Sequence, residues 1–214
     1  MRILFQGDSV TDCCRNREQQ ENANQGLGLG YAFLTTAKML AEYPEKKFEF
    51  FNRGISGNRV VDLYARWKCD ALNLRPDLIS ILIGVNDTWH EKFYQNGVEV
   101  PRYETVYREL LRWTRESLPE VKLILIEPFI LQCGENGVPT PEWEEEIAAR
   151  REVVARLGKE FNIPVIKFQS VLDEACKKAE PNYWLCDGVH PAPAGHQLLS
   201  NEWIKVAESL LNLK

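Results

Sequence analysis

The sequence predicts one α/β domain over residues 1–214, with a parallel sheet of five strands and helices on both of its faces. At 214 residues and 44% apolar composition, the chain is long enough for one well-filled domain and short for two. Five short apolar runs alternate with longer amphipathic segments, which is the pattern of a doubly wound parallel sheet. Polar residues and glycines follow the ends of these runs, where such sheets bind their ligands.

The predicted strands are short apolar runs bounded by polar residues, glycine or proline. The run at 78–83 is almost continuously apolar, as is typical of a central parallel strand that is covered by helices on both faces. Strands are expected at 2–6, 47–52, 78–83, 121–126 and 164–168.

The predicted helices carry apolar residues at helical spacing. In the segment 102–118, for example, the inward stripe consists of Tyr103, Val106, Leu110 and Trp113. Helices are expected at 31–42, 60–72, 102–118, 142–161, 170–179 and 194–213, and loops at 13–25, 89–101, 127–141 and 183–195.

Composition excludes several classes of function. The net charge of −5 and the absence of a basic run disfavour nucleic acid as a partner. No apolar run approaches the roughly 20 residues of a membrane span, and the chain opens directly on its first strand, so we expect a cytoplasmic protein that does not bind a membrane. The six cysteines lack CxxC spacing and are expected to be free thiols rather than zinc ligands.

Polar clusters follow four of the predicted strands. Asp8 and Ser9 come directly after the first strand, Gly57 after the second and Asn86 after the third, while the Asp187–His190 segment follows the last. The carboxyl ends of parallel strands meet at one edge of the sheet, so these residues are expected to lie close together.

These clusters contain the parts of a serine hydrolase. An Asp and a His three residues apart can place the carboxylate on Nδ1 and leave Nε2 free to face a serine. Ser9 would be the nucleophile, His190 the base and Asp187 the group that orients it. The oxyanion donors would be the backbone N–H groups of Ser9 and Gly57 and the side-chain amide of Asn86. Taken singly, each part also has a structural interpretation, such as a turn at Ser9 or a surface Asp–His contact.

Four blocks in the right order resemble the SGNH, or GDSL, hydrolases. They are Gly7-Asp8-Ser9, Gly54-Ile55-Ser56-Gly57-Asn58, Gly84-Val85-Asn86-Asp87 and Asp187-Gly188-Val189-His190-Pro191, and they span nearly the whole chain. The resemblance implies a flavodoxin-like three-layer α/β/α fold, the SGNH hydrolase fold. It also implies metal-independent ester hydrolysis through an acyl-serine, with neither metal nor cofactor.

Within that family the chain looks like the carbohydrate acetylesterases, the acetylxylan esterases in particular. Ala65-Arg66-Trp67, Gly84-Val85-Asn86-Asp87-Thr88-Trp89 and Ala194-Gly195-His196 carry this likeness, whereas Val10 departs from the Leu of the commonest lipase-like form. The expected substrate is an acetylated sugar, foremost a xylo-oligosaccharide. The residues proposed to bind it are Asp8, Asn58, Arg59, Trp89 and Trp184.

Several alternatives stay open at this point. Ser56 is a rival nucleophile, although a hydrogen-bonding role beside Gly57 is favoured, and His196 is expected to be packed or to cap a helix. His90 follows the Asn86 block and could line the site, although an exposed loop residue is favoured. The same triad could serve a lysophospholipase or thioesterase, a two-metal phosphoesterase lacks a supporting motif, and a non-catalytic scaffold would not need the intact set. The sequence permits a homo-oligomer. Aromatic residues in the predicted loops could stack on sugars or only pack their own loops, namely Trp89, Phe93, Tyr94, Phe129 and Trp184.

Overall fold

The computed structural model describes residues 1–18, 24–134 and 137–213, so the predicted loops at 13–25 and 127–141 lie partly outside the described residues. The described residues form one sheet, whose strands all pair in parallel in the order β2-β1-β3-β4-β5. This arrangement confirms the predicted fold class. The strands are β1 (Arg2–Gly7), β2 (Glu49–Asn52), β3 (Leu78–Leu82), β4 (Lys122–Ile126) and β5 (Val165–Ile166).

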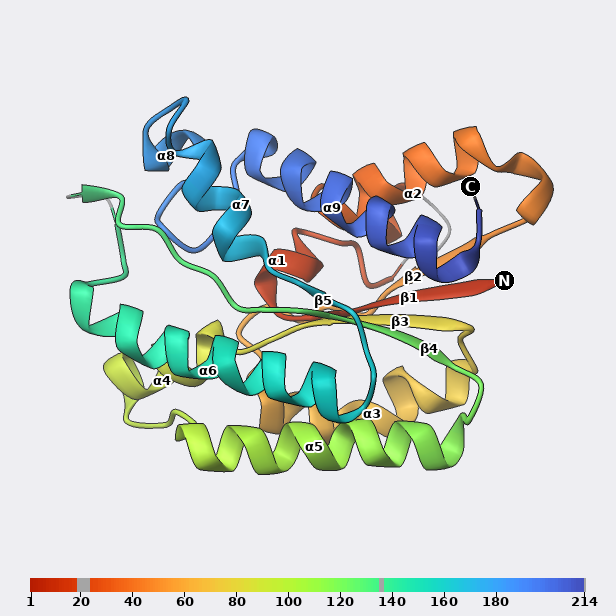
Figure 1. Ribbon diagram of the computed structural model, residues 1–214, viewed down its shortest axis with the longest axis horizontal. Coiled ribbons are helices and arrows are strands. Elements are labelled where there is room, and N and C mark those ends of the chain that lie inside the picture. The colour runs from red at the N-terminus through yellow and green to blue at the C-terminus, as the bar shows by residue number, and fades with distance from the viewer. Residues whose placement is uncertain (19–23, 135–136, 214) are drawn as a thin grey trace.

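Helices cover both faces of the sheet (Figure 1), and the sheet lies between two separate core clusters. One layer contains α2 (Tyr31–Glu42), α7 (Phe168–Ala175) and α9 (Pro193–Leu211), and the other contains α3 (Val60–Asp70), α5 (Val100–Ser117) and α6 (Pro141–Glu160). Alternate side chains of β1 enter different layers, because successive residues of a strand point to opposite faces. Ile3 and Phe5 pack in the first core cluster with Trp203 of α9, and Leu4 packs in the second with Trp67 of α3.

One predicted loop is wrong, because the segment expected as a loop at 89–101 begins as a helix. Helix α4 (Val85–Tyr94) starts directly after β3, and α5 starts at Val100. Gly84, at a φ of +137°, lets the chain turn from the strand into the helix, so the polar cluster around Asn86 forms its first turn. Trp89 packs against Trp143 of α6, at 5.6 Å between ring centroids. This tertiary contact supports a helix whose own apolar pattern is short.

Most other boundaries move by one or two residues, but the helix predicted at 170–179 ends at Ala175, four residues early. Helices α6 and α9 begin at Pro141 and Pro193, since proline fits the first turn of a helix. The predicted loop at 183–195 overlaps the end of a short helix, α8 (Pro181–Trp184). The remaining helical segments are α1 (Ser9–Asp12) and the 3₁₀ turns η1 (Asn24–Leu27), η2 (Pro44–Lys46) and η3 (Leu72–Leu74).

The two ends of the sheet differ. The strands direct their carboxyl ends to the left of Figure 1, and both chain termini lie at the right.

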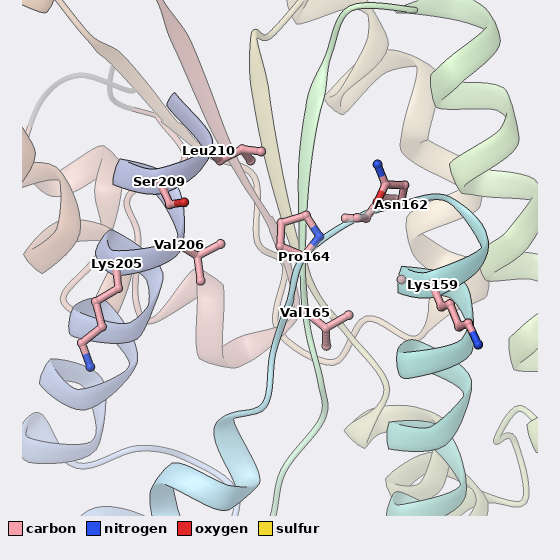
Figure 2. A pocket seen from close by; sticks show the side chains of 10 residues that line it. Lys159, Asn162, Pro164, Val165, Lys205, Val206, Ser209 and Leu210 are labelled. Atoms are coloured by element: carbon pink, nitrogen blue, oxygen red, sulfur yellow. The ribbon is translucent and has the colours of Figure 1, made fainter. Parts of the chain in front are cut away.

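A groove of about 720 Å³ lies where β5 forms one edge of the sheet, between α6 and α9 (Figure 2). Its lining includes Lys159, Pro164, Lys205 and Leu210 but none of the predicted site residues. Among the described residues, no helix combines the length and apolar composition needed to cross a bilayer.

Candidate active site

The end of β1 places Ser9 at the first position of α1. A Cβ atom on Gly7 would lie 2.4 Å from the carbonyl oxygen of Leu82 and 2.4 Å from Thr11 Oγ1, so only glycine allows β3 and α1 to approach here. Asp8 caps the helix, because its Oδ1 accepts a hydrogen bond of 3.1 Å from the backbone N–H of Val10. Asp8 is buried and makes a local hydrogen bond to the backbone, as expected for a residue with a structural role. Ser9 remains partly exposed.

Ser9, His190 and Asp187 form a continuous hydrogen-bonded chain. The Ser9 Oγ lies 2.9 Å from His190 Nε2, and His190 Nδ1 lies 2.7 Å from Asp187 Oδ2. The carboxylate can only accept, so the ring carries its proton on Nδ1 and its Nε2 accepts from the serine hydroxyl. The second carboxylate oxygen accepts from the backbone N–H groups of Val189 and His190, at 2.9 and 2.8 Å. These bonds fix the carboxylate against the loop that carries the histidine.

The electrostatics of the pair match this arrangement. Partial burial raises the pKa of Asp187, but the hydrogen bonds from the His190 ring and from the two backbone N–H groups outweigh burial and lower the pKa to about 2. The hydrogen bond to Asp187 raises the pKa of His190 above 6.5, against the opposing effect of burial. Asp187 is therefore ionised at neutral pH, and an ionised carboxylate in this place can stabilise a protonated imidazole.

The predicted oxyanion donors come from the two neighbouring strand ends. Gly57 has a φ of +82°, a conformation that favours glycine, whereas a Cβ there would meet only His90 Nε2, at 3.9 Å. Asn86 Nδ2 donates to the carbonyl oxygen of Asn58 at 3.1 Å, which holds the amide beside the Gly57 loop. No residue in the described part of the chain accepts a hydrogen bond from the backbone N–H of Ser9 or Gly57. Both N–H groups can therefore bind a substrate oxygen.

Asp12 connects the first block to the Gly57 loop. Its Oδ2 accepts from the backbone N–H of Ser56 at 2.9 Å and from the Ser56 hydroxyl at 3.1 Å. Ser56 therefore has the hydrogen-bonding role that the sequence favoured, and its hydroxyl faces a carboxylate instead of a histidine. The supporting role of Asp12 was missed by sequence reasoning, and the available signal was its position three residues after Ser9.

The five predicted substrate-binding residues are not all placed around Ser9. Asn58 Oδ1 accepts from the guanidinium of Arg66 at 2.7 Å. Arg59 donates to Asp62 at 2.9 Å and to the carbonyl oxygen of Asn96 at 2.6 Å. These side chains hold the start of α3, and neither interaction involves the triad.

The two predicted tryptophans occupy different environments. Trp184 donates from its indole N–H to the carbonyl oxygen of Ala179 at 3.3 Å and packs against the first core cluster. The ring of Trp89, in contrast, lies 6.1 Å from that of His190, measured between centroids. Asp8 is buried behind Ser9, and burial raises its pKa to about 7 against the hydrogen bond from Val10 and the charge of His190. Of these predicted residues, Trp89 has its ring packed against that of His190.

The other candidates also find definite places. His196 is buried and accepts a hydrogen bond from the backbone N–H of Tyr31, as a packed residue would. His90 belongs to α4 and is partly buried, so its assignment to an exposed loop is wrong. Phe129 is buried and packs on Phe168, at 4.9 Å between centroids. Among the described residues, no three His, Cys, Asp or Glu side chains are grouped so that they could hold a metal ion.

Comparisons with known proteins agree with this geometry. The model of the GDSL-like lipase/acylhydrolase family matches residues 5–198. An acetylxylan esterase of Geobacillus stearothermophilus is 34% identical over 209 residues, which is 95% of this chain and 92% of that protein.

Solved structures also resemble this chain over most of its length. A Parabacteroides merdae protein described as a GDSL-like lipase is 41% identical, with a TM-score of 0.92 over 96% of this chain and 94% of that one. The Geobacillus stearothermophilus acetylxylan esterase superposes with a TM-score of 0.86 over 95% of this chain and 92% of its own. Other structures of that esterase are described as catalytic mutants, in which a serine, an aspartate or a histidine is replaced by alanine. With this match over nearly its whole length, the chain belongs to the GDSL-like lipase/acylhydrolase family and is a carboxylic ester hydrolase.

Proposed function

We propose that the protein is a serine esterase that removes acetyl groups from carbohydrates, foremost xylo-oligosaccharides, through an acyl-serine at Ser9. The observation that carries this proposal is the chain of hydrogen bonds from Ser9 through His190 to Asp187. The choice of substrate is supported by the 34% identity to an acetylxylan esterase over 95% of the chain. An acetylated oligosaccharide is the one partner that the proposal requires, and a homo-oligomer and a cytoplasmic location stay predictions.

The first half of the reaction forms the acyl-enzyme. Ser9 Oγ attacks the carbonyl carbon of the acetyl ester while His190 Nε2 takes the hydroxyl proton. The carbonyl oxygen becomes an oxyanion, which accepts from the N–H groups of Ser9 and Gly57 and from the amide of Asn86. When the carbon–oxygen bond to the sugar breaks, the sugar oxygen takes the proton from Nε2 and leaves as a free hydroxyl.

The second half regenerates the serine. A water molecule gives its proton to His190 Nε2 as its oxygen attacks the acetyl carbon, and the same donors hold the second oxyanion. The bond to Ser9 Oγ then breaks, the serine regains the proton from Nε2, and acetic acid is released and ionises. Asp187 stays ionised throughout, because its pKa of about 2 lies far below neutral pH.

The proposal is tested by measuring acetate released from acetylated xylo-oligosaccharides. The wild type is compared with Ser9→Ala, and Ser56→Ala serves as a matched serine control. Each protein is also assayed on nitrophenyl esters whose acyl chains range from acetyl to lauroyl. Release by the wild type and Ser56→Ala but not by Ser9→Ala, together with a preference for acetyl esters, is the expected result. Turnover of long-chain esters without release of acetate from the sugars would replace this proposal with a lipid-type acyl hydrolase that uses the same triad.

A further inference from the structure

The outer face of α4 carries four rings, arranged as two pairs at helical spacing. Trp89 and Phe93 lie 5.6 Å apart and His90 and Tyr94 lie 5.5 Å apart, measured between ring centroids. The two pairs are joined by a contact of 6.4 Å between Phe93 and Tyr94. Residues four apart on a helix are neighbours on one face, so the rings form a continuous surface, here called the α4 aromatic strip.

One end of the strip, formed by Trp89 and His90, lies next to the proposed catalytic residues. Trp89 lies 6.1 Å from the ring of His190, which protonates the leaving alcohol in the proposed mechanism. His90 Nε2 lies 3.9 Å from where a Cβ of Gly57, an oxyanion donor, would be. From these two residues, the strip leads one helical turn away to Phe93 and Tyr94.

The far end of the strip is exposed, and one pair of its rings is supported from below. Phe93 and Tyr94 are 56% and 66% exposed, whereas Trp143 of α6 is only 2% exposed. Trp143 packs edge-on against Trp89 and Phe93, at 5.6 and 6.2 Å between centroids. It belongs to a small core cluster with Val189, the residue before His190. The supported rings therefore have little conformational freedom to lose when a ligand covers them.

We propose that the α4 aromatic strip binds the sugar chain on the alcohol side of the ester, with Trp89 against the acetylated unit and Phe93 and Tyr94 against the units next to it. This inference rests on the proposed function and names the part of the substrate that the strip recognises. The sugar must lie on the His190 side of the scissile bond, because Nε2 delivers the proton to its oxygen. A pyranose ring presents C–H groups on its faces, and aromatic faces, which are electron-rich, pack well against them.

The inference is tested with the double variant Phe93→Ala/Tyr94→Ala. Tyr64→Ala is the matched control, since Tyr64 is 42% exposed on α3 but packs on Trp113 of α5, at 5.7 Å between centroids. Both changes are made in the Ser9→Ala background, and binding of non-acetylated xylo-oligosaccharides of increasing length is measured by calorimetry. Loss of both rings is expected to lower the affinity for the longer chains on the order of tenfold, which corresponds to about 1.4 kcal/mol. The control is expected to bind as tightly as its parent.

Turnover gives the second measurement, in the background that retains Ser9. The ratio of kcat/KM for acetylated xylo-oligosaccharide to kcat/KM for 4-nitrophenyl acetate should fall about tenfold in the double variant. An unchanged ratio with unchanged affinity would overturn the inference. The inference would also be overturned if the double variant changed its oligomeric state, measured by sedimentation, but kept its affinity for the sugars. The strip would then be an interface between copies of the protein. If the wild type released no acetate but affinity for the sugars still depended on both rings, the proposed function would fail and the sugar-binding surface would stand.

Discussion

Two histidines in this molecule each face a potential nucleophile, and only one of them has the surroundings of a base. His190 Nε2 lies 2.9 Å from Ser9 Oγ, and His196 Nε2 lies 3.4 Å from Cys13 Sγ. Ser9 and Cys13 are the first residue and the C-cap of the same short helix, α1. The two pairs thus have similar geometry on the nucleophile side.

The difference lies on the other nitrogen of each ring. His190 Nδ1 faces the carboxylate of Asp187 at 2.7 Å, while His196 Nδ1 accepts from the backbone N–H of Tyr31 at 3.1 Å. The proton of a neutral His196 therefore sits on Nε2 and points to Cys13, so this nitrogen has no lone pair to accept a proton. Burial, followed by the charge of His190, lowers the pKa of His196 to about 4, whereas the pKa of His190 is raised. The third partner, more than the distance to the nucleophile, decides which histidine can be a base.

The largest expected effect comes from removing one nucleophile or the other. Ser9→Ala should lower kcat for acetate release by a factor on the order of 10⁶, since members of a triad act as a unit. Cys13→Ala should leave kcat close to that of the wild type, because His196 cannot activate the thiol. A steady-state assay of both variants checks this. A large loss in Cys13→Ala with its fold intact would show that the second pair takes part.

Replacing the third partner of His190 should be nearly as severe. Asp187→Asn supplies an amide that can donate to Nδ1 and hold the wrong tautomer, and kcat is expected to fall about 10⁴-fold. Circular dichroism controls for folding. A loss of only a few-fold would mean that another acceptor orients the ring, and the comparison between the two histidines would lose its basis.

Asn86→Ala should have an intermediate effect, because it removes one of three proposed oxyanion donors and leaves the triad in place. The expected loss in kcat is about 10²–10³-fold, with little change in KM. Thr88→Ala, two residues along the same helix, is a control for disturbance of α4, since Thr88 is buried there and takes no part in the hydrogen bonds that join Ser9, His190 and Asp187. An equal loss in both variants would argue against an oxyanion role for Asn86.

The pH dependence of kcat/KM should report His190 and not His196. The base must be neutral, and its pKa is raised above 6.5 by Asp187, so activity should fall as the pH drops through a value above 6.5. In Asp187→Asn this inflection should move to lower pH. In His196→Gln it should stay in place, and a shift there would contradict the assignment.

The smallest effect is on stability. His196→Ala leaves the buried N–H of Tyr31 without its acceptor, which costs about 1–3 kcal/mol of unfolding free energy. The pKa of His196 falls from 6.5 to about 4 on folding, so the unfolded chain binds more protons between these values. The wild type should therefore lose stability as the pH falls from 6.5 toward 4, and His196→Ala should lose less. Urea unfolding at several pH values checks both statements.

The sequence predicts the sheet well because buried strands are local patterns, and the structure brings Ser9, His190 and Asp187 into the expected contact. Continuous apolar runs such as 78–83 correspond to buried strands, and parallel strands bring their carboxyl ends together whatever the loops do. That rule places Ser9 at this edge, whereas His190 lies in the loop after α8, so its position 2.9 Å from Ser9 depends on how that loop folds. The same rule places Gly57 and Asn86 at this edge.

What the sequence does not predict depends on partners from distant segments. Asn58 ends the second block and Arg59 follows it, so both look like site residues, but Arg66 and Asp62 occupy their side chains. Helix α4 is not predicted because the residue that packs against it, Trp143, lies on α6. The position of Trp184 is not predicted for the same reason, because its side chain packs against core residues on other helices and strands. Periodicity does not reveal such contacts.

The central claim is that Ser9 carries the acetyl group during turnover. The most direct test is to mix the enzyme with acetylated xylo-oligosaccharide, quench with acid within one turnover, and map acetylation by peptide mass spectrometry. We predict an acetyl group on the peptide that contains Ser9, formed at the rate of acetate release and absent from Ser9→Ala. Acetylation of Ser56 instead, or acetate release at full rate by Ser9→Ala, would contradict the account.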